Sequence, residues 1–170
     1  MQEHKVTLLQ NNRLLTAMVS AIGAALCIWT LAAIDNSLNS DWVLMAPFGA
    51  TMVLIFGVHQ SPLAQPKNVI FGHLITAAVG LIFINSLSVT PLTLGLAVGC
   101  GVFLMLLTDT THPPAGGNPL LIMLGGHYDW TFLFHPVLLG TVAIVILAVI
   151  YHRFIPGHIY PYKPQTTHKS

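Results

Sequence analysis

The sequence contains very few charged residues. Asp, Glu, Lys and Arg make up 6% of its 170 residues and the net charge is +1, whereas about a quarter of the residues in a soluble domain are charged. So small a charge gives no basic surface for nucleic acid, and we expect no nucleic-acid partner. The apolar share is 54% and the mean hydropathy is +0.75. The lipid bilayer is therefore the expected solvent, and the sequence predicts an all-α polytopic membrane protein with one transmembrane domain, residues 1–170.

Cysteine and enzyme motifs are scarce too. The two cysteines, Cys27 and Cys100, each lie inside an apolar run, which is typical of packing residues rather than of a disulfide framework. The sequence has no nucleotide-binding G-x-x-x-x-G-K, redox C-x-x-C or zinc-protease H-E-x-x-H motif. We expect neither an enzymatic activity nor a cofactor.

Long apolar runs are present instead. Four of them, residues 14–34, 67–87, 92–107 and 131–151, are predicted to form membrane-spanning helices. The first is too long for a signal peptide and lacks a small-residue cleavage pattern, so it is expected to be retained. Two shorter apolar runs follow Pro47 and Pro114, and both are interrupted by proline and glycine.

The signs of the flanking charges predict the topology, because Lys and Arg favour the cytoplasmic side of a membrane. Counting every apolar run as a crossing gives six, and both termini then lie in the cytoplasm. The basic residues on that side are Lys5, Arg13, Lys67, Arg153, Lys163 and Lys169, and the acidic residues outside are Asp35, Asp41 and Asp129. An alternative with four crossings and two re-entrant runs moves Lys67 to the outer face. The expected location is the cell (inner) membrane.

The most unusual stretch runs from Asp109 to Gly126, DTTHPPAGGNPLLIMLGG. Two adjacent prolines without N–H groups and two glycines exclude one continuous helix. Within a bilayer such a break is tolerated only where protein or a watery cavity supplies hydrogen-bond partners. The stretch is therefore predicted to contain a functional site.

A second stretch resembles the first. PFGATMVLIFGVH, from Pro47 to His59, aligns with PAGGNPLLIMLGGH, from Pro114 to His127, with one gap. Residues 14–90 and 91–152 then form two units of long, short and long helix, followed by a cytoplasmic tail, residues 153–170. Three crossings per unit make this an inverted repeat, as in many transporters. The alternative is chance recurrence of proline, glycine and apolar residues.

The two short runs cannot cross a bilayer of about 30 Å as helices alone, so their N-termini are expected to face each other at depth. Helix N-termini carry unpaired N–H groups and partial positive charge, which favour an anion. The predicted binding residues are Pro47, Phe48, Gly49, Ala50, Thr51, His112, Pro113, Pro114, Gly116, Gly117 and Asn118. Asp109 and His112 are predicted to form a proton relay, with capping of the local backbone as the alternative for each. We interpret His73 as a packed or interhelically hydrogen-bonded residue, and His59 and His127 as interfacial.

The string TDTTHPPAGGNPLL, residues 108–121, resembles the signature of the HPP family of small membrane proteins, named for its His-Pro-Pro. The stretch DWVLMAPFGATMVLIFGVHQSPLAQPKNVIFGHL, residues 41–74, resembles that family's other characteristic region. The resemblance implies a compact multi-span domain, a transporter role and no enzymatic activity. Family members from photosynthetic lineages are associated with nitrite movement.

The sequence thus predicts a transporter or channel that passes a small inorganic anion, with nitrite as the leading candidate. A protonated His112 is expected to assist weak-acid anions, and its loss to flatten the pH response more than loss of His73. One alternative is a membrane metal or cofactor protein using Asp109, His112, His73 and His135. Another is a structural membrane subunit. Each of these functions is compatible with a homo-oligomer.

Overall fold

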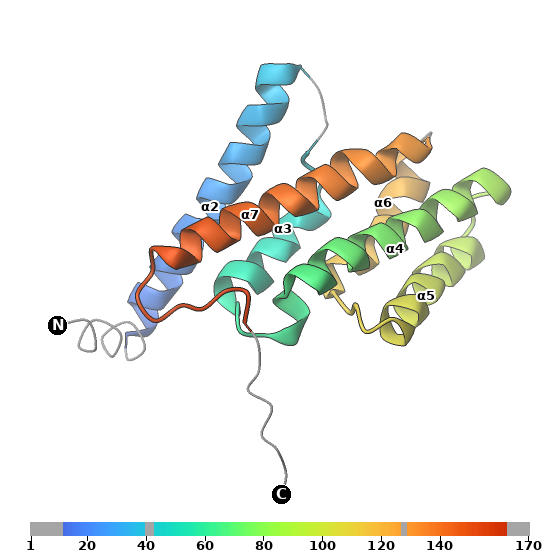
Figure 1. The fold of residues 1–170 in the computed structure, drawn as a ribbon. Coiled ribbons are helices and arrows are strands. Elements are labelled where there is room, and N and C mark those ends of the chain that lie inside the picture. Colours follow the sequence, from blue (N-terminus) through green and yellow to red (C-terminus); the bar gives the residue numbers. More distant parts are fainter. Residues whose placement is uncertain (1–11, 40–42, 127–128, 163–170) are drawn as a thin grey trace, which may run out of the picture.

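A computed structural model describes residues 12–39, 43–126 and 129–162, and within these ranges the regular structure is entirely helical. The first half contains α2 (Arg13–Leu38), α3 (Pro47–Met52), the π-helix η1 (Val53–Gly57), the 3-10 helix η2 (Pro62–Ala64) and α4 (Pro66–Ser86). The second half contains α5 (Pro91–Leu107), η3 (Pro113–Gly117), α6 (Asn118–Gly125), η4 (Trp130–Leu133), η5 (Phe134–Leu138) and α7 (Leu139–Arg153) (Figure 1). Three segments are long and apolar enough to cross a membrane: α2, α4 and Trp130–Arg153. The predicted all-α membrane fold is confirmed.

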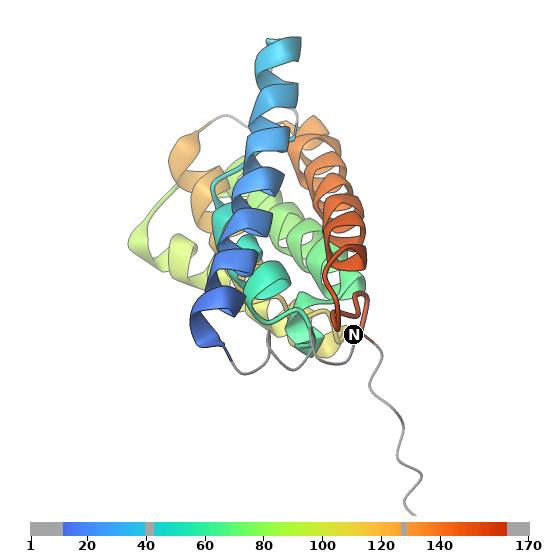
Figure 2. The same ribbon diagram turned by 90° about the vertical axis from the view of Figure 1, so that its left-hand side faces the viewer.

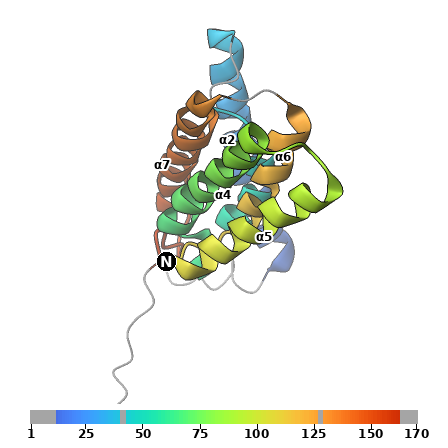
Figure 3. The ribbon, with the colours of Figure 1, turned by 90° about the vertical axis from the view of Figure 1, so that its right-hand side faces the viewer.

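The helix α4 forms the centre of the bundle. It contacts α5, α6 and α7, and it also contacts the 3-10 helix η3. Figures 1 and 3 show α5 on one side of α4 and α7 on the other, with the short helices α3 and α6 between the longer ones. The helix α2 packs against η1 and α7, and its last turns project beyond the rest of the bundle (Figure 2). The short helices therefore pack against the long ones, and each keeps some residues exposed.

Local sequence determines where the helices begin. Pro66 and Pro91 occupy first-turn positions, where a missing N–H costs nothing. Thr90 and Thr93 form a reciprocal capping box at the start of α5. Near the end of α2 the buried Asp35 carboxylate accepts hydrogen bonds from the N–H groups of residues 43 and 44, each at 3.0 Å. That bond pair fixes the entry of the chain into α3.

Two predicted segments differ from the structure. Residues 131–151 do not form one regular helix, because His135 has extended backbone angles and Pro136 lacks an N–H. This break lies inside η5 and separates η4 from the residues that lead into α7. The other difference concerns the stretch from Asp109 to Gly126. Its helix break lies at residues 108–112, upstream of the two prolines. Pro113 and Pro114 themselves begin η3, where fixed φ angles suit a first helical turn, and η3 continues directly into α6.

The charges separate along the bundle axis. Arg13, Lys67 and Arg153 lie at the start of α2, the start of α4 and the end of α7, which share one end of the molecule, here called the basic end (Figure 1). Asp35 and Asp129 lie at the opposite end. The order long, short, long occurs in each half of the chain. The inverted relation of the halves and the side of the membrane that each end faces stay predictions, and the predicted pairing with His127 lies outside the described residues.

Candidate functional site

The hydroxyl of Thr51 joins two histidines in the interior of the bundle. Thr51 lies on α3, and its Oγ1 is 3.0 Å from Nε2 of His112 and 3.1 Å from Nε2 of His73. All three side chains are completely buried. His112 precedes η3 and His73 lies on α4, so one hydroxyl connects the short helix, the central helix and the break.

The network continues beyond each histidine. The Nδ1 atom of His112 is 2.8 Å from the main-chain oxygen of Leu63, in η2. On the other side, Nδ1 of His73 is 3.0 Å from Nδ2 and 3.3 Å from Oδ1 of the Asn118 amide, which is also completely buried. The Asn118 Nδ2 atom is also 3.0 Å from the hydroxyl oxygen of Thr76. We call His112, Thr51, His73 and Asn118 the histidine relay.

Counting donors and acceptors assigns the protons of the neutral relay. A carbonyl can only accept, so His112 carries its proton on Nδ1 and donates to Leu63. His112 Nε2 then accepts from the Thr51 hydroxyl, and Thr51 Oγ1 accepts from Nε2–H of His73. His73 Nδ1 in turn accepts from the Asn118 amide. Every hydrogen bond in the neutral relay therefore points in the same direction, from Asn118 to Leu63.

The relay also has acceptors for one additional proton. If His112 gains a proton on Nε2, the Thr51 hydroxyl can turn to the Pro47 carbonyl, 3.4 Å away, and accept from both rings. If His73 gains a proton on Nδ1, the Oδ1 atom of Asn118 is within reach. Buried polar groups are costly unless they are hydrogen-bonded. The arrangement keeps either protonated state paired, which is what proton transfer through a membrane interior needs.

Two predicted features of the site differ from the structure. Asp109 is exposed at the end of α5 and is not the partner of His112, whose ring nitrogens face Leu63 and Thr51. The predicted anion-binding N–H groups are also occupied. At the start of α3 the N–H groups of Phe48 and Gly49 donate to the carbonyls of residues 45 and 46, and N–H of Ala115 donates to the carbonyl of residue 112. A tight turn at each start thus uses the N–H groups of Phe48, Gly49 and Ala115.

The other predicted residues fall on different surfaces. Phe48 is buried with its ring edge-on to His73, at 5.2 Å between centroids. A Cβ atom at Gly117 would lie 3.9 Å from the Pro47 ring, so the first turn of α3 packs against η3, and Gly116 faces open space. The exposed residues of the predicted set are Gly49, Ala50 and Pro113, and Pro114 is half-buried. The sequence predicted His112, Thr51 and Asn118 as polar site residues and His73 as a packed or interhelically hydrogen-bonded histidine. The hydrogen bonds of His73 do reach two other helices, α3 and α6, but its connection to the three site residues was not predicted.

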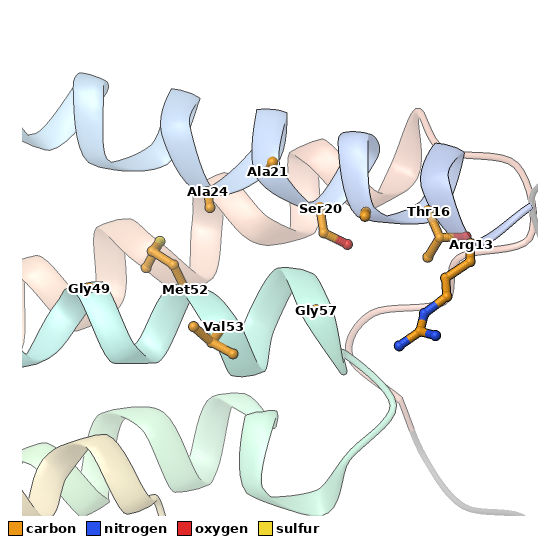
Figure 4. A pocket seen from close by; sticks show the side chains of 10 residues that line it. Arg13, Thr16, Ser20, Ala21, Ala24, Gly49, Met52, Val53 and Gly57 are labelled. Atoms are coloured by element: carbon orange, nitrogen blue, oxygen red, sulfur yellow. The ribbon is translucent and has the colours of Figure 1, made fainter.

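A groove of about 700 Å³ opens on the other side of α3. It lies between α2 and α3, and Figure 4 shows the Arg13 side chain at one end and the Ser20 hydroxyl directed into it. The residues that line it are Arg13, Thr16, Ala17, Ser20, Ala21, Ala24, Gly49, Met52, Val53 and Gly57. The polar residues, Arg13, Thr16 and Ser20, occupy the basic end, and small apolar residues occupy the rest. The sequence predicted Arg13 only as a cytoplasmic charge, because nothing in its local pattern indicates a groove.

The helix α3 therefore has two chemically different faces. Phe48 and Thr51 point to the buried relay, whereas Gly49 faces the groove, as does Val53 at the start of η1. Gly49 and Thr51 are two residues apart, so both lie within one turn of the helix, which rises about 5.4 Å. A groove with a cation at its mouth and a histidine relay thus share a single short helix.

Comparison with known proteins shows the family to which the chain belongs. The model of the HPP transmembrane region matches residues 9–161. The chain belongs to the HPP transmembrane family. Two transmembrane proteins of Dictyostelium discoideum are similar to this HPP domain, with 36% identity over 126 residues and 34% identity over 127 residues. The matches cover 70% and 69% of this chain but 44% and 40% of the relatives, so the HPP domain spans less than half the length of either relative. No solved structure matches it.

Proposed function

We propose that this HPP domain is a proton-coupled transporter of a small weak-acid anion, with nitrite as the leading substrate. The observation that supports this proposal best is the histidine relay, which offers a hydrogen-bond acceptor for an additional proton at each of its two rings. Ionisable side chains inside a membrane domain are expensive and usually serve transport or proton transfer. A relay that served only to pack helices would not require an alternative acceptor for each ring.

The groove between α2 and α3 is the proposed entry path for the anion. Arg13 is the cation at its mouth, and the hydroxyls of Thr16 and Ser20 follow along the same face of α2. Beyond Ser20 the lining is apolar, so a bare anion would lose its hydration without gaining a charged partner. The cheaper route is to protonate the anion where α3 separates the groove from the relay.

The proton balance of this step is simple. The anion takes one proton from the relay and moves on as the neutral acid, and the relay takes one proton from the aqueous side to return to its earlier state. Nitrite and formate are conjugate bases of weak acids and fit this cycle, whereas nitrate and chloride do not. We further propose that the basic end faces the cytoplasm, in agreement with the positive-inside rule.

Flux in proteoliposomes tests the proposal. Neutral weak acids also cross bare lipid, so the protein-dependent flux is measured against protein-free liposomes at each pH. We expect protein-dependent nitrite flux to rise as external pH falls, because more relays then carry the additional proton, and we expect little flux of nitrate or chloride. Equal, pH-independent flux of nitrite and nitrate would contradict the proposal.

The variant Arg13→Gln tests the groove in the same assay. Loss of the positive charge of Arg13 at the mouth of the groove is expected to raise the KM for nitrite. The maximal rate of transport should stay nearly unchanged, since Arg13 is remote from the relay. Lys67→Gln is the matched control, because Lys67 is a cation of the same end outside the groove. An equal effect of both substitutions would show that Arg13 contributes only to the general surface potential.

A further inference from the structure

A second group of histidines lies outside the relay, at the basic end. His59 follows η1, His152 is in the last turn of α7 and His158 lies in the segment after α7. One ring nitrogen from each of the three lies within 4.8 Å of the other two. We call these three residues the histidine triad.

The triad has a different hydrogen-bond pattern from the relay. The Nε2 atom of His59 is buried and has no hydrogen-bond partner, alone among the buried side-chain nitrogen and oxygen atoms of the described residues. The Nδ1 atoms of His152 and His158 face each other at 3.0 Å, and a neutral pair can share only one proton there. A buried nitrogen without a hydrogen-bond partner is costly, and its lone pair can instead bind a metal ion.

The partner of His152 fixes the orientation of its ring. The Nε2 atom of His152 donates to the main-chain carbonyl of Ile55, 2.9 Å away, which leaves the Nδ1 lone pair directed at His158. A metal-binding histidine typically donates its other N–H to a carbonyl or carboxylate in this way. The His152 ring is also held between Phe56 and Tyr160, at centroid distances of 5.6 Å and 5.4 Å.

The chain segments that carry the other two histidines are also tied together. The Gln65 amide donates to the carbonyl of His59 at 2.9 Å, and its oxygen accepts from the N–H of Tyr162 at 2.7 Å. The Tyr160 hydroxyl donates to the carbonyl of Ala64 at 2.9 Å. Figure 1 shows the segment after α7 crossing the basic end beneath α3. The segment that carries His158 is thus held against the turn that carries His59.

We propose that the histidine triad binds a divalent transition metal ion, with Zn²⁺ as the representative. Three neutral imidazoles suit Zn²⁺, Co²⁺, Ni²⁺ or Cu²⁺, and a fourth position is left for water or an anion. Zn–N bonds of about 2.0–2.1 Å in a tetrahedral site place ligand nitrogens about 3.3 Å apart. The Nδ1 atoms of His152 and His158 are 3.0 Å apart, close to this spacing. The widest pair is at most 4.8 Å apart and has to close by no more than about 1.5 Å. His59 and His158 lie outside the α-helices, where side-chain rotation can supply that movement.

Occupancy would join the end of the broken helix α3–η1 to the segment after α7. This metal site is distinct from the sequence-based alternative, which used Asp109, His112, His73 and His135. It is also independent of the proposed transport function, since none of the three histidines belongs to the relay or lines the groove.

The test is metal binding by the purified full chain in detergent, after treatment with a chelator. Zn²⁺ is titrated in competition with a chromophoric chelator, and Co²⁺ is used in a parallel sample for its visible spectrum. We expect one ion per chain with a tetrahedral Co²⁺ spectrum, and at least a tenfold weaker affinity in His59→Ala and in His158→Ala. His135→Ala is the matched control and is expected to bind as tightly as the wild type. His152→Ala is avoided because its ring is buried and packed.

A second measurement separates the triad from adventitious binding by other histidines. Zn²⁺ is expected to slow hydrogen exchange at residues 155–162 in the wild type but not in His158→Ala. Binding that is absent in the wild type, or that is unchanged in the double variant His59→Ala/His158→Ala, would overturn the proposal. Binding that is lost equally in His135→Ala would overturn it as well.

Discussion

The relay and the triad are built from the same side chain but differ in how its nitrogens are paired. In the relay, both ring nitrogens of His73 and His112 have partners, and the described contacts include an acceptor for an added proton. In the triad, one buried nitrogen has no partner and two others face each other. The first pattern suits movement of protons and the second suits a metal ion. The partners of the ring nitrogens, rather than the presence of histidine, distinguish the two proposed functions.

The largest effect is expected from Thr51→Val, which keeps the shape of the side chain and removes its hydroxyl. His112 Nε2 and His73 Nε2 would both lose their shared partner, at a cost of about 1–3 kcal/mol for each buried group. We expect protein-dependent nitrite flux to fall to the level of protein-free liposomes across the pH range. The matched control is Thr51→Ser, which keeps the hydroxyl and should retain the pH response. Normal pH-dependent flux in Thr51→Val would show that protons do not pass through the relay.

A double-mutant cycle gives the next test. The sequence favoured a larger effect for His112→Ala than for His73→Ala, but the structure connects both rings in series through Thr51. We therefore expect the two single variants to flatten the pH response of nitrite flux equally. The double variant should lose no more than either single one, because one broken link already interrupts the chain. Losses that multiply in the double variant would mean that the two histidines act independently.

The stability of variants, measured in the metal-free protein, gives a direct comparison of the relay and the triad. His73→Phe removes one hydrogen-bond partner from the buried Thr51 hydroxyl and one from the Asn118 amide, and each group keeps another partner. We therefore expect it to lower the free energy of unfolding by about 0.5–1.5 kcal/mol for each lost hydrogen bond. His59→Phe instead replaces a ring whose buried nitrogen has no partner, so we expect an unchanged or slightly higher unfolding temperature. Both are measured by thermal unfolding in detergent with a chelator present. A large loss for His59→Phe would show that its nitrogen has a structural partner.

The sequence predicted more of the fold than of the site. Composition and long apolar runs predict membrane helices, because a bilayer requires about 20 apolar residues for each full crossing. Proline and glycine placed the short helices near Pro47 and Pro114, although the break itself lies upstream of the prolines. His73 was predicted to pack or to hydrogen-bond between helices, but its partners were not, because a lone histidine in an apolar helix shows no partner in sequence. The triad joins residues 59, 152 and 158, and only tertiary packing brings residues so far apart together.

The smallest effect is expected from Asp109→Asn, which tests whether the relay extends to α5. The sequence favoured Asp109 as the carboxylate partner of His112, whereas the structure places it exposed at the end of α5. Asp109 has a φ of 53°, in the left-handed region, and asparagine tolerates that conformation better than most residues. The substitution therefore removes the charge without straining the backbone. An exposed charge contributes about 0–1 kcal/mol, so nitrite flux at each pH should stay within about twofold of the wild type. A flattened pH profile in Asp109→Asn would mean that this carboxylate reaches His112 during transport and that the proton path begins at α5.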